Sequence, residues 1–233
     1  MKLKNKIATT LLLFAITISA YGQDEESENK LSVDIGADLV SSYIWRGMEY
    51  AGISIQPALS ISFYGLTFGA WGSASFSTIE KEVDLYFSYE IKGLSVGLTN
   101  YWWYEDGVNY FKDKESHLLD ATIGYTFPEK FPLSLEISTM IDGEGDKDEK
   151  GKKYYSTYIS ASFPFSIDQI DCELGIGVSP WKGMYSEKFD VASISAKATK
   201  NLQLSSKYSL PVFTEFIISP TQNKVYLVFG LKF

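Results

Sequence analysis

The sequence predicts an all-β protein, a transmembrane, antiparallel, up-and-down β-barrel of about twelve strands with periplasmic termini. Three observations predict this fold. Apolar and polar residues alternate with period two along nearly the whole chain, in segments close to the roughly 9–11 residues of a tilted membrane strand. Short and long connections alternate between successive segments. Aromatic residues, 15% of the chain, gather near the segment ends, as in the interfacial girdles of a barrel.

The first residues have the pattern of a secretory signal peptide. Three lysines precede a short apolar run at 7–20, and small residues follow just before Gln23. The run is shorter than the roughly 20 apolar residues that a spanning helix needs. The expected organisation is a cleaved signal peptide at 1–22, a short linker at 23–30 and the barrel at 31–233.

The amino-acid composition argues against several classes of function. Removal of the signal peptide takes three lysines away, so the formal net charge falls from −8 to −11. Such an acidic chain is a poor partner for nucleic acid, since phosphate binding needs clustered Lys and Arg. The single Cys172 excludes an internal disulfide framework and a multi-cysteine metal site. The single His117 weakens every His-dependent catalytic scheme, and no cofactor is expected.

The alternation defines the strands one by one. From Leu31 to Trp45, apolar residues hold most odd positions, while Ser, Asp and Gly hold many even ones. We interpret one face as contacting lipid and the other as lining a narrow lumen, where serine and glycine leave room for neighbours. The same pattern predicts strands at roughly 31–45, 53–64, 66–76, 81–91, 94–104, 115–127, 133–141, 154–163, 170–178, 189–199, 202–213 and 224–233.

The connections between these strands alternate in length. Short turns are expected at 64–65, 92–93, 128–132, 164–169 and 200–201. Longer, more polar loops are expected at 46–52, 77–80, 105–114, 142–153, 179–188 and 214–223. With a periplasmic N-terminus, the short turns are periplasmic and the long loops face outward. A soluble β-sandwich is the alternative, but it leaves the even strand lengths and the loop asymmetry unexplained.

The segment "SSYIWRG", followed by "QPALSISFYGLTFGAW", resembles the TorF-type porin family of small outer-membrane β-barrel proteins. The closing "YSLPVFTEFIISPTQNKVYLVFGLKF" is similar to that family's final hairpin. The residues that carry the resemblance are Ser41, Tyr43, Trp45, Arg46, Gly47, Pro57, Ala58, Leu59, Gly69 and Trp71. The resemblance implies a barrel and a porin role, but no substrate. The C-terminal Phe233 resembles the signal that the barrel-assembly machinery recognises, which implies that machinery and outer-membrane lipid as partners.

The polar face of the strands supplies the candidate lumen or pore-lining residues. They are Asp34, Asp38, Arg46, Glu82, Asp84, Glu90, Asp120, Glu136, Glu173, Lys197 and Lys207. Carboxylates outnumber cations, so a water-filled lumen would favour cations. In a plugged barrel the same residues would instead pair across the interior. Arg46 either contacts a solute at a constriction or forms a salt bridge with Asp84 or Asp120, the reading we favour because an unpaired buried Arg is costly.

Two other features suggest chemistry only weakly. The carboxylates of "DGEGDKDEKG" at 142–151 alternate like calcium ligands, but Lys147 and Lys153 break the EF-hand pattern, and a solvated outward loop is expected.

His117 and Cys172 each fall on the alternate positions of their strand that are expected to face lipid. A hydrolase or acyltransferase would require His117 beside a nucleophile such as Ser156. No enzymatic activity is expected.

The function that these features predict is passive diffusion of small solutes, with a preference for cations, across the outer membrane of a Gram-negative bacterium. The alternative is a non-conducting structural barrel that presents its loops outward. A lipid-active barrel enzyme is the third possibility. A pore needs a continuous water path past Arg46 and the carboxylates, whereas a structural barrel has those groups mutually paired.

Overall fold

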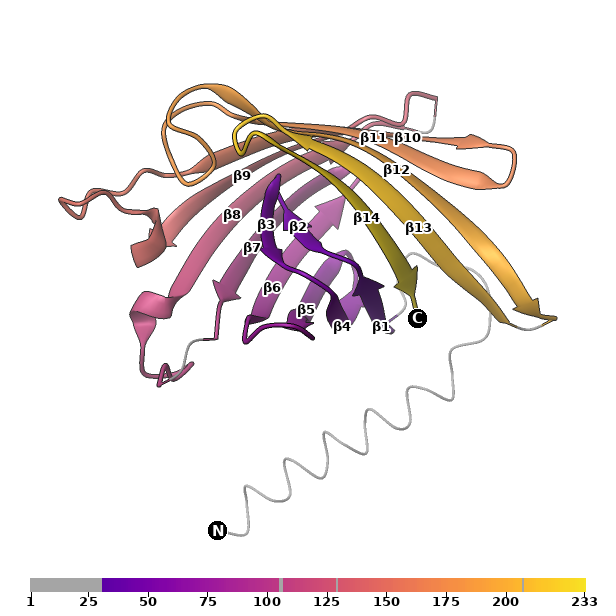
Figure 1. Ribbon diagram of the computed structural model, residues 1–233, viewed down its shortest axis with the longest axis horizontal. Helices are drawn as coiled ribbons and strands as arrows, with labels where there is room; N and C mark the ends of the chain where they lie inside the picture. The colour runs from indigo at the N-terminus through magenta and orange to yellow at the C-terminus, as the bar shows by residue number, and fades with distance from the viewer. Residues whose placement is uncertain (1–30, 105–106, 129, 207) are drawn as a thin grey trace, which may run out of the picture.

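The computed structural model describes residues 31–104, 107–128, 130–206 and 208–233 (Figure 1). The predicted signal peptide at 1–22, the linker at 23–30 and the candidate Lys207 lie outside the described residues. Two short 3₁₀ turns accompany the strands, η1 (Lys114–Ser116) and η2 (Glu144–Asp146). Within the described ranges, no helix is both long and apolar enough to cross a membrane.

Twelve antiparallel strands close into one barrel, as the sequence predicts. Each wall strand pairs with the next along the chain, and β14 pairs back with β1 through Asp38–Lys232, Leu39–Leu231 and Val40–Gly230. The wall strands are β1 (Ser32–Val40), β4 (Ser54–Phe63), β5 (Leu66–Ser75), β6 (Lys81–Ile91), β7 (Leu94–Trp102), β8 (His117–Thr126), β9 (Ser134–Gly143), β10 (Thr157–Ile167), β11 (Ile170–Ser179), β12 (Asp190–Ser205), β13 (Tyr208–Ser219) and β14 (Lys224–Lys232).

The outer surface of the barrel is apolar. Large hydrophobic side chains that alternate along the strands point away from the interior and are exposed, among them Ile35, Leu59, Ile123, Phe216 and Leu227. The intervening positions carry the polar and small residues that face inward. The period-two pattern therefore corresponds to two faces of one closed sheet, rather than to the apolar core of a sandwich.

The two ends of the barrel differ, as the connection lengths predict. The turns β4–β5, β6–β7, β8–β9, β10–β11 and β12–β13 lie at one end, which is also where β1 begins and β14 finishes. The longer segments at 103–116, 144–156 and 180–189 lie at the other end. We call these the short-turn end and the long-loop end.

Several predicted strand boundaries are wrong. β10 runs on to Ile167, so most of the turn predicted at 164–169 is strand. The turn predicted at 200–201 is still strand, because β12 runs on to Ser205. Leu202 and Leu204 keep the outward parity there, so the alternation passes through the two polar residues. As a result β13 begins six residues later than predicted and extends to Ser219, leaving only 220–223 as a connection.

The first strand is also shorter than predicted. It ends at Val40 instead of 45, and the chain then forms a second, separate hairpin of β2 (Tyr43–Trp45) and β3 (Met48–Ala51). Because Val40 and Ser54 are direct register partners, this hairpin is an insertion in the β1–β4 connection. It folds into the barrel, where Tyr43, Gly47 and Ala51 are buried, instead of forming the outward loop predicted at 46–52. Figure 1 shows the hairpin in indigo within the outline of the barrel.

Glycines in the wall make space for interior aromatic side chains. A Cβ on Gly69 would meet the ring of its cross-strand neighbour Tyr86 at 2.1 Å, and one on Gly230 would meet the ring of Phe213 at the same distance. Each ring therefore lies flat against the sheet over a residue without a side chain.

Candidate functional site: the inserted hairpin and the cavity beneath it

The turn of the inserted hairpin is a two-residue Arg46–Gly47 turn. Both residues have positive φ, 51° and 84°, as in the type I′ turns that suit the twist of a hairpin. The wall hairpins at Tyr64–Gly65 and Lys92–Gly93 use the same pairing of a non-glycine residue with glycine and nearly the same angles. This shared dipeptide is the sequence signal that could have revealed a hairpin at 43–51.

Arg46 fastens the tip of the hairpin to distant parts of the barrel. Its Nη2 donates to Asp120 Oδ2 of β8 at 2.8 Å, and its Nη1 donates to the hydroxyl of Tyr185 in the 180–189 loop. The guanidinium carbon also lies 5.2 Å from the ring centroid of Tyr158 on β10. Asp120 accepts a second hydrogen bond from Tyr101 at 3.3 Å. Of the two salt bridges considered for Arg46, the structure therefore forms the one with Asp120.

The environment of Arg46 keeps its partner Tyr185 neutral. Burial raises the pKa of Tyr185 above its usual range, although the neighbouring Arg46 opposes that shift. The phenol is therefore neutral, and its oxygen accepts the hydrogen bond from the guanidinium. Asp120 is fully buried and only 9% of the Arg46 side chain is exposed, so the ion pair is shielded from solvent.

Apolar packing secures the rest of the hairpin. Trp45 and Met48 pack against a buried cluster that includes Leu118, Met140 and Tyr185. On the other face of the hairpin, Ile44 packs against a second cluster formed by Val40, Phe213, Ile217 and Val228. The hairpin therefore joins both buried clusters of the described interior near the long-loop end.

Gly47 marks the closest approach of the hairpin to the wall. A Cβ at this position would lie 2.3 Å from the carbonyl oxygen of Ala192 and 3.0 Å from Ser219 Oγ. Ser219 Oγ itself donates to that same carbonyl at 3.1 Å. The tip of the hairpin thus reaches β12 and β13 while its arginine reaches β8, so the hairpin crosses the barrel interior.

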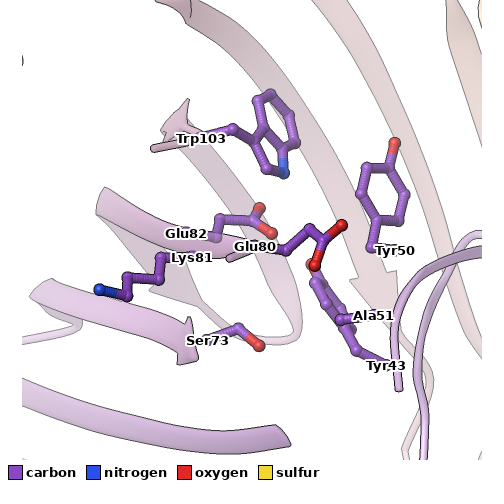
Figure 2. Close-up of a pocket in the computed structure, with 8 residues that line it drawn as sticks. All are labelled: Tyr43, Tyr50, Ala51, Ser73, Glu80, Lys81, Glu82 and Trp103. Carbon is purple, nitrogen blue, oxygen red and sulfur yellow. The ribbon is translucent and has the colours of Figure 1, made fainter. Parts of the chain in front are cut away.

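A small pocket of about 40 Å³ lies in the seam between the hairpin and the wall (Figure 2). Tyr43, Tyr50 and Ala51 line it from the hairpin. The wall contributes Ser73, Glu80, Lys81, Glu82 and Trp103. Figure 2 shows the carboxylates of Glu80 and Glu82 turned toward the pocket and the ammonium of Lys81 turned away from it.

The carboxylates of this seam are among the most buried in the barrel. Glu82 is 3% exposed and Asp84 is 6% exposed. Burial, and then the nearby charges of Glu82 and Asp84, raise the pKa of Tyr43 well above its usual range, so that its phenol stays neutral. Among the candidates for pore lining, Glu82 and Asp84 are buried, and Asp120 is paired with Arg46.

A larger cavity of about 500 Å³ lies inside the barrel, beside the tip of the hairpin. Polar and apolar groups line it in about equal measure, with a carboxylate from Glu136 and an edge formed by Trp45 and Arg46. Glu136 Oε1 accepts a hydrogen bond from Ser138 Oγ at 3.2 Å and is exposed to the cavity. The remaining polar lining comes from Tyr86, Ser88, Ser95, Thr99, Tyr101, Thr122, Ser138 and Tyr158.

Other candidate residues lie away from the hairpin. Lys197 is the register partner of both Glu173 and Glu215, and its Nζ lies 4.0 Å from Glu215 Oε2. Glu215 was missed because the boundary error placed it in a predicted outward loop. Near the short-turn end, Lys232 Nζ lies 3.9 Å from Asp38 Oδ2.

Asp34 and Glu90 lie on wall strands near the short-turn end, and both are exposed. Asp34 is the register partner of Ser60, and Glu90 is the register partner of Ser95. Neither carboxylate takes part in an ion pair of the described residues. These two candidates therefore lie apart from Arg46 and its partners.

His117 has partners of a structural kind. Its Nε2 lies 2.8 Å from the backbone carbonyl oxygen of Tyr110, so this nitrogen carries the proton, and its Nδ1 accepts from Asn100 Nδ2 at 2.9 Å. Both ring nitrogens are thereby used without a hydroxyl partner. Ser156, the serine considered beside it, instead donates to Asp146 and accepts from the backbone N–H of Met184 at 2.7 Å.

The acidic segment at 142–151 is partly a packed loop. Asp146 is 1% exposed and accepts hydrogen bonds from the Ser156 backbone and hydroxyl, whereas Asp142 pairs with Lys153 at 2.6 Å. Glu144 pairs with Lys147. In the part of the chain that the structure describes, no three His, Cys, Asp or Glu side chains are grouped to hold a metal.

No protein-family model matches the chain, and no curated protein is significantly similar to it.

Proposed function

We propose that this chain is an outer-membrane channel for passive diffusion of small solutes, and that the inserted hairpin forms its constriction. The observation that carries the proposal is a closed barrel with an exposed apolar exterior and an interior cavity of about 500 Å³ with polar side chains in its lining. A lipid bilayer is the solvent that favours this inverted arrangement. The predicted signal peptide and the short motifs that resemble TorF-type porins support export to the outer membrane.

The interior charge favours cations. Glu136 lines the cavity without a cationic partner among the described ion pairs, and Lys197 faces two carboxylates in register. Arg46, the one guanidinium at the constriction, is neutralised by Asp120. A water-filled path past these groups therefore has a negative potential that would concentrate small cations.

The hairpin limits the size of the solutes. It crosses the interior at the long-loop end, and its aromatic residues pack on both sides. We therefore propose passage of ions and other small solutes around the hairpin, and not of oligomeric ones. Assembly would use the exposed C-terminal Phe233 as the signal for the barrel-assembly machinery, with outer-membrane lipid as the other partner.

A non-conducting structural barrel is the second candidate. The pairing of Arg46 with Asp120, and the filling of the long-loop end by aromatic side chains, favour it. Neither candidate assigns an enzymatic activity, since His117 uses both ring nitrogens in structural hydrogen bonds.

Single-channel recording separates the two candidates. The mature protein is refolded in a planar bilayer, and folding is checked by its heat-modifiable migration on a gel. Steady openings that reverse at a cation-selective potential in a salt gradient are the expected result. A folded barrel that remains silent would support the structural alternative and contradict the channel.

A further inference from the structure

One side of the interior cavity is lined by hydroxyl groups without partners. Ser88 on β6, and Ser95 and Thr99 on β7, line the cavity and are half-buried. Within the described residues, none of these three hydroxyls forms a hydrogen bond with another protein group. The hydroxyls of Thr122 and Ser138 differ, since they lie 2.9 Å apart and bond to each other. Three unused hydroxyls, each able to donate and to accept, therefore face the same space.

Tyr86 adds a flat apolar surface beside these hydroxyls. It is the direct cross-strand neighbour of Thr99, and its ring lies against the sheet over Gly69. No other aromatic ring of the described residues packs against it, so the opposite face of the ring is turned toward the cavity that it lines. Such a ring can pack against the C–H groups of a ligand whose hydroxyls bond to the neighbouring polar side chains.

Glu136 supplies an acceptor at the end of the hydroxyl row. Ser95, Gly124 and Glu136 are consecutive register partners across β7, β8 and β9. A Cβ on Gly124 would meet Ser95 Oγ at 2.6 Å, so this hydroxyl leans over β8 toward the carboxylate. One oxygen of Glu136 accepts a hydrogen bond from Ser138 at 3.2 Å. The other oxygen has no hydrogen-bond partner among the described residues and is left for a ligand.

The charges of the lining argue against an anionic ligand. Arg46, the cation at the edge of the cavity, pairs with Asp120 at 2.8 Å. Among the lining residues this leaves the Glu136 carboxylate and no unpaired cation. Hydroxyls outnumber charges, and polar and apolar groups contribute about equally to the lining. This mixture matches a ligand that is rich in hydroxyls and has an apolar face.

We propose that this cavity binds a neutral monosaccharide. A pyranose ring has C–H groups on one face, which would pack on Tyr86, and hydroxyls around its rim, which would bond to Ser88, Ser95 and Thr99. Adjacent sugar hydroxyls would donate to the Glu136 carboxylate. The cavity volume of about 500 Å³ lies within the range of small-molecule sites, about 300–1,000 Å³. The small number of contacts predicts a Kd on the order of millimolar, weak enough for the sugar to leave again.

Ligand-detected NMR measures binding without any need for conduction. Passage of sugars rests on the proposed function, whereas binding needs only the cavity. The mature protein is refolded in micelles of a detergent without a sugar headgroup and titrated with D-glucose. Saturation transfer to the C–H protons of glucose is expected, with a millimolar midpoint. The double variant Ser88→Ala with Ser95→Ala should raise the Kd by about tenfold. Since neither hydroxyl has a partner in the protein, this variant should fold like the wild type.

Gly97→Leu is a steric test of the same site. Gly97 lines the cavity between its register partners Ser88 and Thr122. A Cβ at this position would come no closer than 3.4 Å to another group, the carbonyl oxygen of Phe87, so a side chain fits the wall and extends into the cavity. Glucose binding should be lost. Ser60→Ala is the matched control, because Ser60 faces inward on β4 but does not line the cavity, and its Kd should stay unchanged.

Single-channel recording separates the sugar site from the channel. Glucose should reduce the current of the wild type more than that of the double serine variant. The proposal is overturned if glucose gives no saturable transfer, or if Gly97→Leu and the double variant both bind glucose like Ser60→Ala. A silent barrel that binds glucose would contradict the channel alone. A conducting barrel that does not bind glucose would contradict the sugar site alone.

Discussion

The guanidinium of Arg46 lies 2.8 Å from the carboxylate of Asp120, a residue 74 positions away in the sequence. Arg46 belongs to the insertion between β1 and β4, whereas Asp120 belongs to β8, five strands further around the wall. The ion pair thus fastens the hairpin to a distant strand of the barrel wall. Its burial explains both why the hairpin keeps its position and why Arg46 is not free to attract anions.

Breaking this pair on one side should destabilise the barrel. Arg46→Met leaves the buried Asp120 carboxylate unpaired, which we expect to lower the free energy of unfolding by about 3–5 kcal/mol. The double variant Arg46→Met with Asp120→Asn should recover part of that loss. Urea unfolding in lipid vesicles measures the free energy of unfolding of both variants. Lys224→Met is the control, because its pairing with Glu49 at 3.7 Å is exposed and should contribute less than about 1 kcal/mol. An Arg46→Met variant as stable as the control would refute the buried clamp.

Gly47 should tolerate no side chain. Gly47→Ala places a methyl group 2.3 Å from the Ala192 carbonyl oxygen, in addition to the strain of alanine at a φ of 84°. Gly151→Ala has similar strain at a φ of 75°, but nothing lies within 4 Å of its Cβ. We expect Gly151→Ala to cost about 1–2 kcal/mol and Gly47→Ala clearly more. Equal unfolding free energies for the two variants would mean that the hairpin does not pack against β12.

A charge on the outer face should impair folding only in a membrane. Leu227, in the middle of β14, is 72% exposed. In a soluble protein such a position accepts arginine readily, whereas near a bilayer midplane Leu227→Arg should cost about 2–4 kcal/mol. Phe111→Arg, at an exposed residue of the 103–116 segment, is the matched control. Comparing folding yields in vesicles tests this, and two variants that both fold like the wild type would argue against a lipid-facing exterior.

Glu136 should set part of the ion selectivity. Glu136→Gln removes a carboxylate that lines the interior cavity and has no ion-pair partner among the described residues, so the reversal potential in a salt gradient should move toward zero. Glu144→Gln, in the 144–156 segment of the long-loop end and paired with Lys147, should change it little. Asp84→Asn should also have little effect, because Asp84 is only 6% exposed. A shift with Glu144→Gln and none with Glu136→Gln would relocate the filter to the outward loops.

The sequence predicted the wall of the barrel well, since each wall strand must present one face outward and one inward. That requirement produces the alternation of apolar and polar residues, for example from Val83 to Ile91. Strand ends were harder, because Lys200 and Asn201 look like a turn but continue the outward and inward parity of β12. Because of this error, Glu215 was placed in a predicted outward loop instead of in the barrel interior.

The candidate site was only partly predictable. The acidic inward parity identified Glu82, Asp84 and Asp120, and Arg46 was considered as a salt-bridge partner of Asp120. The inserted hairpin was missed because residues 43–45 continue the alternation of β1 in sequence, although the chain leaves the sheet after Val40. Tyr185 and Tyr158, which complete the arginine site, come from segments that no local pattern connects to residue 46.

The most direct test of the constriction is to remove the hairpin. Since Val40 and Ser54 are register partners, residues 41–53 can be replaced by a two-residue Asn-Gly turn, together with Asp120→Asn to avoid a buried unpaired charge. Single-channel conductance of this folded variant is then compared with that of the full-length mature barrel. Our account predicts a severalfold larger conductance with weaker discrimination by solute size. An unchanged conductance would show that the hairpin does not limit passage.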